Sequence, residues 1–282
     1  MSEPDATPTA EPAAADPFAD PTAAEHRRAI GIDVGGTGVK AAVVDLVTGE
    51  LASPRIREKT PQPATPAAVI ETVGRIVDRL TEGGHLHPTM PAGAGLPGVV
   101  KRGRLVTAAN IDKGWVDYAA QEALEARLGR PVRLINDADA AGLAEGSFGA
   151  AKDVPGTVLL LTIGTGIGSA LLVDGRLVES TEFGHVAYRR KSAEFWISGA
   201  ARERRGIGWR RWAGEFSEYL SLVEMWFWPD LIILGGGVSK EYAKYGKWLK
   251  SRAPIVTARF LNTSGIIGAA LAAGGHEEAP AD

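Results

Sequence analysis

The chain has 282 residues, of which 45% are hydrophobic and 23% are charged, and its formal net charge is −3. This composition predicts a folded protein of one large or two ordinary domains, and the small net charge gives no general electrostatic reason to bind nucleic acid or a membrane. The sequence contains no cysteine. Disulfides, thiolate zinc sites and a cysteine nucleophile are therefore excluded.

The first 27 residues are rich in Ala, Pro, Asp, Glu and Thr, so we expect a disordered tail that cannot form a core. They lack the basic start and the apolar stretch of a signal peptide. The apolar run VLLLTI at 158–163 is far too short to span a bilayer. We therefore expect a cytoplasmic protein with no membrane or nucleic-acid partner.

Strands are predicted at 29–34, 39–45 and 51–58, followed by a helix over 66–82 whose apolar residues recur at helical spacing. A strand that runs into a Gly/Pro turn over 92–100, a helix over 115–129, a short buried strand over 132–137 and an Ala-rich helix over 137–149 complete the first half. The second half opens in the same way, with strands at 157–164, 167–174 and 175–180. Helices over 192–204 and 209–227, a buried strand that runs into a triple-Gly turn over 231–237, a further helix, a strand over 254–259 and a helix over 264–273 follow.

An internal repeat organises these elements. The segment DVGGTGVKAAVVD at 33–45 matches TIGTGIGSALLVD at 162–174 in its strand end, its Gly/Thr turn and its closing Asp. Such a repeat predicts a duplicated α/β fold with a cleft between the copies. We expect a tail at 1–27, an N-terminal lobe at 28–136, a C-terminal lobe at 137–263, and a helix and tail at 264–282, with this helix packing back on the N-terminal lobe.

Both copies of the repeat contain a Gly-rich hairpin. Glycine lets main-chain N–H groups approach a ligand closely, and a row of such groups forms an anion site. One such hairpin would be more typical of an ordinary tight turn, but two at matching positions favour phosphate binding. The candidate donor-binding residues are Gly35, Gly36, Thr37 and Lys40 in the first hairpin and Gly164, Thr165, Gly166 and Gly168 in the second.

Two aspartates end predicted strands. Asp33 is interpreted either as a residue that orients a hydrated Mg²⁺ or as a cap on the glycine N–H groups that follow it. Asp137 opens a helix in INDADAAGLAE (135–145), where it suits a general base for phosphoryl transfer but equally suits a helix cap. Asp139 is interpreted as structural.

Further polar residues suit a sugar site. Glu182 and His185 in TEFGHVAY (181–188), Glu194 in SAEFWISG (192–199) and Asn110 in TAANID (107–112) can hydrogen-bond sugar hydroxyls. A lone histidine is more often an ordinary core or surface residue. In LIILGGGVS (231–239), three glycines after a buried strand permit close approach of a nucleoside or of distal phosphates, or form a plain strand-to-helix turn. These glycines are Gly235, Gly236 and Gly237.

Together these segments resemble the ROK family of sugar kinases, which has the actin-like (ribonuclease H-like) fold of hexokinase, Hsp70 and actin. The resemblance covers about residues 29–273 and rests on DVGGTGVK, GLPGVV, TAANI, NDADAAGLAE, GTGIG, EFGH, GGGVS and SGIIGAA in order. It implies that Asp137 is the catalytic base and that both hairpins hold phosphate. The sugar-binding positions that it implies are Asn110, Asn136, Asp137, Glu182, His185 and Glu194, and Gly235, Gly236 and Gly237 match the motif near the adenosine or distal donor.

The chain departs from the family in one segment. Typical members carry a Cys-rich zinc motif after the EFGH-like segment, whereas this chain has VAYRRKSAEFWISG, so zinc is not expected. This zinc-free version resembles the subgroup of polyphosphate glucokinases and polyphosphate–ATP glucomannokinases. That resemblance implies glucose as acceptor, with mannose as a second acceptor in some close relatives, inorganic polyphosphate and/or ATP as donor, and Mg²⁺ as cofactor.

Residues 189–211 carry eight Lys and Arg side chains but only Glu194 and Glu203 as acids. This stretch is interpreted either as a surface for a polyanionic donor or as a solvated helix face. The aromatic run WFW at 226–228 suggests a homodimer interface. The alternatives to a polyphosphate-using kinase are a strictly ATP-dependent ROK hexokinase, a ROK-type repressor and an actin-like filament protein. The repressor would need a DNA-binding segment that residues 1–28 do not resemble.

Overall fold

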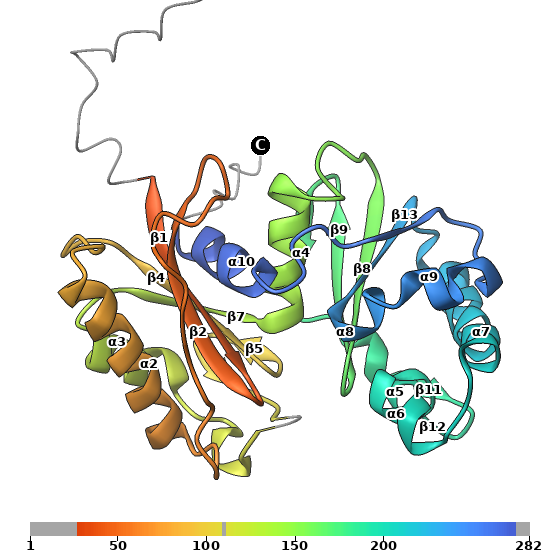
Figure 1. Cartoon of the computed structure of the whole chain (residues 1–282), viewed down its shortest axis with the longest axis horizontal. Helices are drawn as coiled ribbons and strands as arrows, with labels where there is room; N and C mark the ends of the chain where they lie inside the picture. Colours follow the sequence, from red (N-terminus) through yellow and green to blue (C-terminus); the bar gives the residue numbers. More distant parts are fainter. Residues whose placement is uncertain (1–26, 109–110, 275–282) are drawn as a thin grey trace, which may run out of the picture.

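The computed structural model describes residues 27–108 and 111–274, and its framework is two five-stranded sheets side by side (Figure 1). The first has the order β3-β2-β1-β4-β7 and the second the order β10-β9-β8-β13-β14. The strands are β1 (Arg28–Gly35), β2 (Gly38–Asp45), β3 (Ile56–Glu58), β4 (Ala92–Leu96), β7 (Val132–Asn136), β8 (Thr157–Ile163), β9 (Ile167–Val173), β10 (Arg176–Val178), β13 (Leu231–Gly235) and β14 (Ile255–Thr257).

The two sheets also share their strand directions. In each, the first three strands along the chain pair antiparallel, and the last two join in parallel. The matching topologies agree with the repeat seen in the sequence. Two small antiparallel ribbons are added, formed by β5 (Val100–Lys101) with β6 (Arg104–Leu105) and by β11 (Ala187–Tyr188) with β12 (Lys191–Ser192).

Helices cover the sheets. They are α2 (Pro66–Glu82), α3 (Ala120–Leu128), α4 (Asp137–Phe148), α5 (Ala193–Ile197), α6 (Gly199–Arg204), α7 (Trp209–Phe227), α8 (Gly236–Ser239), α9 (Tyr242–Tyr245) and α10 (Ser264–Ala273), with short 3₁₀ turns at η1 (Lys113–Trp115), η2 (Phe183–His185) and η3 (Gly246–Trp248). Helix α2 begins at Pro66, whose missing N–H is not needed there, and its N-cap Thr65 accepts a hydrogen bond from Ala68 N.

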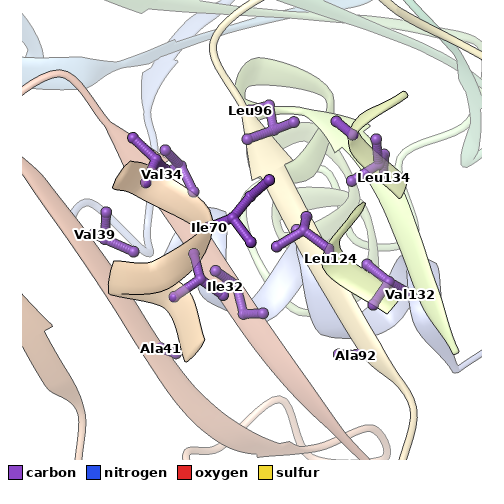
Figure 2. Close-up of a cluster of buried hydrophobic side chains, with 14 of the residues drawn as sticks. Ile32, Val34, Val39, Ala41, Ile70, Ala92, Leu96, Leu124, Val132 and Leu134 are labelled. Atoms are coloured by element: carbon purple, nitrogen blue, oxygen red, sulfur yellow. The ribbon is translucent and has the colours of Figure 1, made fainter. Parts of the chain in front are cut away.

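The core of the N-terminal lobe lies between α2, α3 and the first sheet. Figure 2 shows Ile70 of α2 and Leu124 of α3 among strand residues such as Ile32, Leu96 and Leu134. Burial of these side chains is the main favourable term that holds the helices on the sheet. A second large cluster fills the C-terminal lobe around α7, where Trp212, Phe216 and Tyr219 are fully buried.

Helices α4 and α10 lie between the two sheets (Figure 1). They approach their neighbours so closely that only glycine fits. A Cβ on Gly268 of α10 would lie 1.6 Å from the carbonyl oxygen of Ala140 of α4, and a Cβ on Gly93 of β4 would lie 1.7 Å from that of Ala269. The backbone of α10 therefore rests directly on both α4 and the first sheet.

Three predicted elements differ from the structure. The strand predicted at 51–58 is regular only at 56–58, because Pro54 has no N–H to donate to a ladder. The helix predicted at 115–129 begins at Ala120, after a 3₁₀ turn that buries Trp115. The helix predicted at 192–204 is interrupted at Ser198, which is extended and whose Oγ caps α6 by accepting from Ala201 N. Within the described ranges, no helix has both the length and the apolar character needed to cross a membrane.

Candidate functional site

The site forms where strands of both sheets end. Because the carboxyl ends of parallel strands meet at one edge, β1, β4 and β7 deliver the first hairpin, Pro97-Gly98 and Asp137 to the same place. In the second sheet, β8 leads into its hairpin and β13 into α8. These ends line one pocket of about 350 Å³.

Most of the sequence-predicted site residues line this first pocket. They are Gly35, Gly36, Thr37, Asn136, Asp137, Gly164, Thr165, Gly166, Gly168, Glu182, His185, Glu194 and Gly236. Asp33, Lys40, Gly235 and Gly237 are not in its lining, and Asn110 lies outside the described residues. The pocket also contains Pro97, Gly98, Thr107 and Thr162, which the sequence analysis did not single out.

The two hairpins are tight. Gly35 pairs with Gly38 in the first, and in the second Gly164 N donates to Gly166 O at 3.0 Å. Gly236 approaches the second hairpin with a φ of +74°, and a Cβ there would lie 2.5 Å from Ile163 O. Only glycine suits this position, because the conformation and the space both exclude a side chain.

Asp33 and Lys40 face each other across β1 and β2. Lys40 Nζ lies 2.7 Å from Asp33 Oδ2, and the side chains are 24% and 16% exposed. A Cβ on Gly265 at the start of α10 would lie 2.9 Å from the Asp33 carboxyl carbon. The Asp33 carboxylate therefore sits between a lysine and the first turn of a helix, two features that stabilise negative charge.

Asp137 stands at the junction of β7 and α4. Burial raises the pKa of Asp137 to about 7, with further increases from the charges of Asp33 and Glu182, and the Ala138 N–H opposes this shift. Asp137 Oδ1 accepts from Ala138 N at 2.8 Å. A carboxyl group of this kind changes its protonation state near neutral pH.

Asn136 makes its described hydrogen bonds to the backbone. Its Oδ1 accepts from Ala138 N and Asp139 N, which caps α4, and its Nδ2 donates to Gly98 O at 3.0 Å. The side chain thus fixes both the start of α4 and the Pro97-Gly98 turn. These bonds support the pocket wall, a role that the sequence analysis did not assign to Asn136.

Glu182, His185 and Glu194 meet in the pocket. His185 Nδ1 lies 3.2 Å from Glu182 Oε2, and His185 Nε2 lies 3.5 Å from Glu194 Oε1. Glu194 Oε2 also accepts from Ile167 N of the second hairpin at 3.4 Å. Burial and the Glu194 charge raise the pKa of Glu182, and His185 opposes this shift. The trio presents several acceptors and one imidazole to a polar ligand.

A second pocket of about 460 Å³ adjoins the first, since both contain Gly164 and Thr165. Gly237, Arg202, Glu203, Trp209, Glu241 and Lys244 also line it. The Arg202 guanidinium carbon lies 4.1 Å from the centroid of the Trp209 ring, on which Tyr245 also stacks. Trp209 and Lys244 were not singled out in the sequence, since neither belongs to a motif.

The basic stretch 189–211 is less uniform than its sequence suggests. Arg205 donates to both carboxylate oxygens of Glu215, at 2.6 and 2.8 Å, and Arg189 and Arg211 also contact Glu215. Arg205 and the other bound arginines lower the pKa of Glu215. Because Glu215 lies outside the stretch, counting acids within 189–211 overestimated its positive charge. Arg202 lines the second pocket, and its acidic partner, 3.8 Å away, is the exposed Glu203.

Comparison with known proteins agrees with this architecture. The model of the ROK family matches residues 29–195. A polyphosphate glucokinase of Mycobacterium tuberculosis (strain CDC 1551 / Oshkosh) is 45% identical over 253 residues, which cover 89% of this chain and 93% of the relative.

Solved structures give the same result. The inorganic polyphosphate/ATP-glucomannokinase from Arthrobacter sp. strain KM has a TM-score of 0.82 and 47% identity, covering 86% of this chain and 96% of its own. A ROK family glucokinase from Streptomyces griseus, solved with glucose and AMPPNP, has a TM-score of 0.73 and 26% identity. The match covers 87% of this chain and 99% of the glucokinase chain. The predicted fold class, two actin-like α/β lobes, is confirmed. The chain belongs to the ROK family.

Proposed function

We propose that this chain phosphorylates the 6-hydroxyl of glucose, with inorganic polyphosphate or ATP as donor. The observation that carries the proposal is the first pocket, in which both Gly-rich hairpins meet Asp137 and the Glu182–His185–Glu194 trio. A phosphate-binding half and a hydroxyl-binding half thus face one carboxyl group. The relatives described above are kinases of this type, which supports the assignment.

In the proposed reaction, the hairpin N–H groups hold the terminal phosphoryl group, and Glu182, His185 and Glu194 orient the sugar. Asn110 is a further proposed sugar contact. The sugar O6 forms a bond to the terminal phosphorus, and the bond from that phosphorus to the bridging oxygen breaks. The hydroxyl proton passes to Asp137. Phosphoryl transfer depends mainly on such positioning and on electrostatic stabilisation.

Magnesium fits the residues present. Mg²⁺ prefers oxygen ligands, keeps several waters, and usually binds through one or two carboxylates together with substrate phosphates. Asp33, at the base of the first hairpin, would hold it through water, and the ion would neutralise charge on the phosphates. Lys40, now paired with Asp33, would then be available to the donor.

We further propose that the second pocket receives the distal part of the donor. It continues from Gly164 and Thr165, the residues that would hold the terminal phosphates. It presents Arg202 and Lys244, which are ion-paired with Glu203 and Glu241 and would exchange these partners for phosphate. Either the distal phosphates of a chain or a nucleoside would occupy this space. Gly237 leaves free space at the wall of the second pocket, because a Cβ at this position would have no heavy atom within 4 Å.

The test is an initial-rate assay of glucose and of mannose, each with polyphosphate and with ATP. Turnover of glucose with both donors is the expected result, and turnover with ATP alone would favour a strictly ATP-dependent hexokinase. No turnover with any pair would contradict the proposal. Arg202→Gln should raise the KM for polyphosphate about tenfold, and more than the KM for ATP. Arg79→Gln, an exposed arginine on α2, is the control.

We also propose a homodimer. Met225, Trp226 and Trp228 at the end of α7 are 62%, 50% and 65% exposed, an unusual grouping of large apolar side chains on a surface. Phe227 of the predicted WFW run instead packs inward, with its ring centroid 4.6 Å from that of Phe183. Sedimentation velocity should show a dimer that Trp226→Ser weakens. A monomer at all concentrations, or a filament, would contradict the proposal.

A further inference from the structure

Asp139 is a buried carboxyl group that the proposed reaction does not use. It lies on α4 two residues after Asp137 and is 1% exposed. Its Oδ2 accepts from Ser180 N at 2.7 Å, whereas its Oδ1 is buried without a hydrogen-bond partner among the described residues. Burying a carboxyl group costs free energy, so the hydrogen bond that Asp139 accepts from Ser180 N has a structural or functional reason.

That bond fixes an unusual residue. Ser180 has a φ of +64°, in the left-handed region that a residue with a side chain seldom adopts unless its surroundings impose it. Ser180 Oγ also donates to Val100 O at 3.2 Å. Val100 belongs to β5 of the N-terminal lobe, whereas Ser180 follows β10 of the C-terminal lobe. Ser180 therefore connects α4, the C-terminal sheet and the N-terminal lobe.

The residues after Ser180 are fixed from a third side by Ser169 of β9. Ser169 Oγ donates to Thr181 O at 2.9 Å and accepts from Phe183 N at 3.0 Å, and Thr181 Oγ1 donates to Ser169 O at 3.0 Å. Ser169 is itself 1% exposed. Glu182 stands between Thr181 and Phe183, so its backbone is held on both sides.

We infer that Asp139 is a positioning residue for Glu182, acting through Ser180. We name residues 180–183 the strap. Asp139 holds the first residue of the strap, Ser169 holds the middle, and the Ser180–Val100 bond ties the strap to the opposite lobe. The strap then presents the Glu182 carboxylate to His185 and to the sugar. This inference rests on the proposed sugar-binding role of Glu182.

The geometry predicts a selective effect. Without the Oδ2 acceptor, the Ser180 N–H loses its partner and the left-handed conformation loses its support, so the Glu182 carboxylate samples more positions. The phosphate hairpins are held by the pairing of β1 with β2 and of β8 with β9, in which the Asp139–Ser180 bond takes no part. Loss of Asp139 should therefore weaken sugar binding and leave donor binding unchanged.

The test compares Asp139→Ala with Asp139→Asn, which retains an acceptor for Ser180 N. Asp139→Ala should raise the glucose KM, and the Kd from calorimetry, about tenfold or more, with the donor KM unchanged. Asp139→Asn should restore most of the affinity. Ser169→Ala, a small change at a buried position, should also raise the glucose KM. It replaces Asp139→Ala as the test variant if Asp139→Ala does not fold.

Glu145→Gln is the matched control. Glu145 is a second fully buried carboxyl group on α4, but its oxygens accept from Ala150 N and Phe260 N, away from the strap. The Glu145→Gln variant should have a lower thermal unfolding temperature but an unchanged glucose affinity. A loss of stability alone therefore does not explain the result expected for Asp139→Ala.

A double-mutant cycle tests the route of the effect. If Asp139 acts through Glu182, Asp139→Ala should change glucose affinity little in a Glu182→Gln background, because interacting residues are not additive. Additive losses, or an unchanged glucose Kd in Asp139→Ala and Ser169→Ala, would overturn the inference. If the wild-type chain neither binds nor phosphorylates glucose, the proposed function fails instead, so the two failures are distinguishable.

Discussion

The raised pKa of Asp137 and its proposed role as general base can be tested in one experiment. Burial and the neighbouring charges of Asp33 and Glu182 raise its pKa from an ordinary value of 3.8 to about 7. A general base works only when it is deprotonated, and it works best with a pKa near the pH of the reaction. Activity should therefore follow the deprotonation of this single carboxyl group.

The size of the effect follows from that pKa. At pH 6, roughly one tenth of the Asp137 groups would be deprotonated, compared with nearly all of them at the ordinary pKa. The wild-type kcat/KM for glucose should thus fall about tenfold between pH 8 and pH 6. Asp137→Asn should lower kcat by about 10²- to 10⁴-fold, the usual contribution of a general base, and should remove this pH dependence.

The assay measures sugar phosphate formation from pH 5.5 to 8.5 at saturating donor. Circular dichroism at each pH would confirm that both proteins remain folded. A wild-type rate that is constant from pH 5.5 to 8 would refute the raised pKa. An Asp137→Asn variant with more than a tenth of wild-type activity would refute the role as base.

Stability provides an independent test that needs no substrate. Because the pKa is higher in the folded than in the unfolded chain, the folded state binds more protons between pH 4 and 7, and the stability contribution of Asp137 is lost as the pH rises through this range. A tenfold difference between the folded and unfolded acid constants corresponds to about 1.4 kcal/mol. Asp137→Asn, which carries no charge, should gain stability relative to the wild type as the pH rises from 4 to 7. An unchanged difference would contradict the burial argument.

Three further substitutions test the framework of the site by denaturant unfolding. Asn136→Ala removes the cap of α4 and should lower the free energy of unfolding by about 1–2 kcal/mol. Gly268→Ala places a Cβ 1.6 Å from Ala140 O, so it should lower the free energy of unfolding by at least about 3 kcal/mol or prevent folding. An unchanged free energy of unfolding would show that α10 can move away from α4. Glu215→Gln should cost roughly 3 kcal/mol, because it leaves the largely buried Arg205 without its counter-charge; unchanged stability would show that solvent already screens this pair.

Local patterns in the sequence predicted most of the fold. The repeat at 33–45 and 162–174 predicted two matching sheets, because strand ends and Gly turns are encoded by adjacent residues. The errors occurred where a distant residue or a cap decides the outcome. The helix predicted over 192–204 is broken because Ser198 caps the next segment, and its apolar spacing does not reveal that cap.

The candidate site likewise has contacts that the local sequence predicts and contacts that only the fold creates. Glu182 and His185 lie three residues apart, so their contact could be expected from a single turn of chain. The bond between Asp139 and Ser180 joins residues 41 positions apart, and nothing local distinguishes a buried Asp on an Ala-rich helix from an ordinary one. Arg205 likewise looked available for a ligand until the fold placed Glu215 beside it.

The acidity of the first pocket bears on how it can bind an anionic donor. Asp137, Glu182 and Glu194 all line it, with Asp33 close behind, and the mutual repulsion of these carboxylates is part of what raises the pKa values of Asp137 and Glu182. A phosphate chain entering alone would add to that repulsion. Positive charge must therefore arrive with the donor or be held nearby.

Lys40 supplies one such charge, but it is already paired with Asp33 at 2.7 Å. A divalent cation bound with the donor would neutralise Asp33 and release Lys40 to the phosphates, which is consistent with the proposed requirement for Mg²⁺. Arg202 and Lys244 line the second pocket beside their ion-pair partners Glu203 and Glu241. Distal phosphates that compete with these partners would be attracted away from the carboxylates of the first pocket. Because exposed charges are screened by salt, this attraction should weaken as ionic strength rises, and more for a long polyphosphate than for ATP. Equal salt dependence for the two donors would show that the donor is held by the hairpins alone.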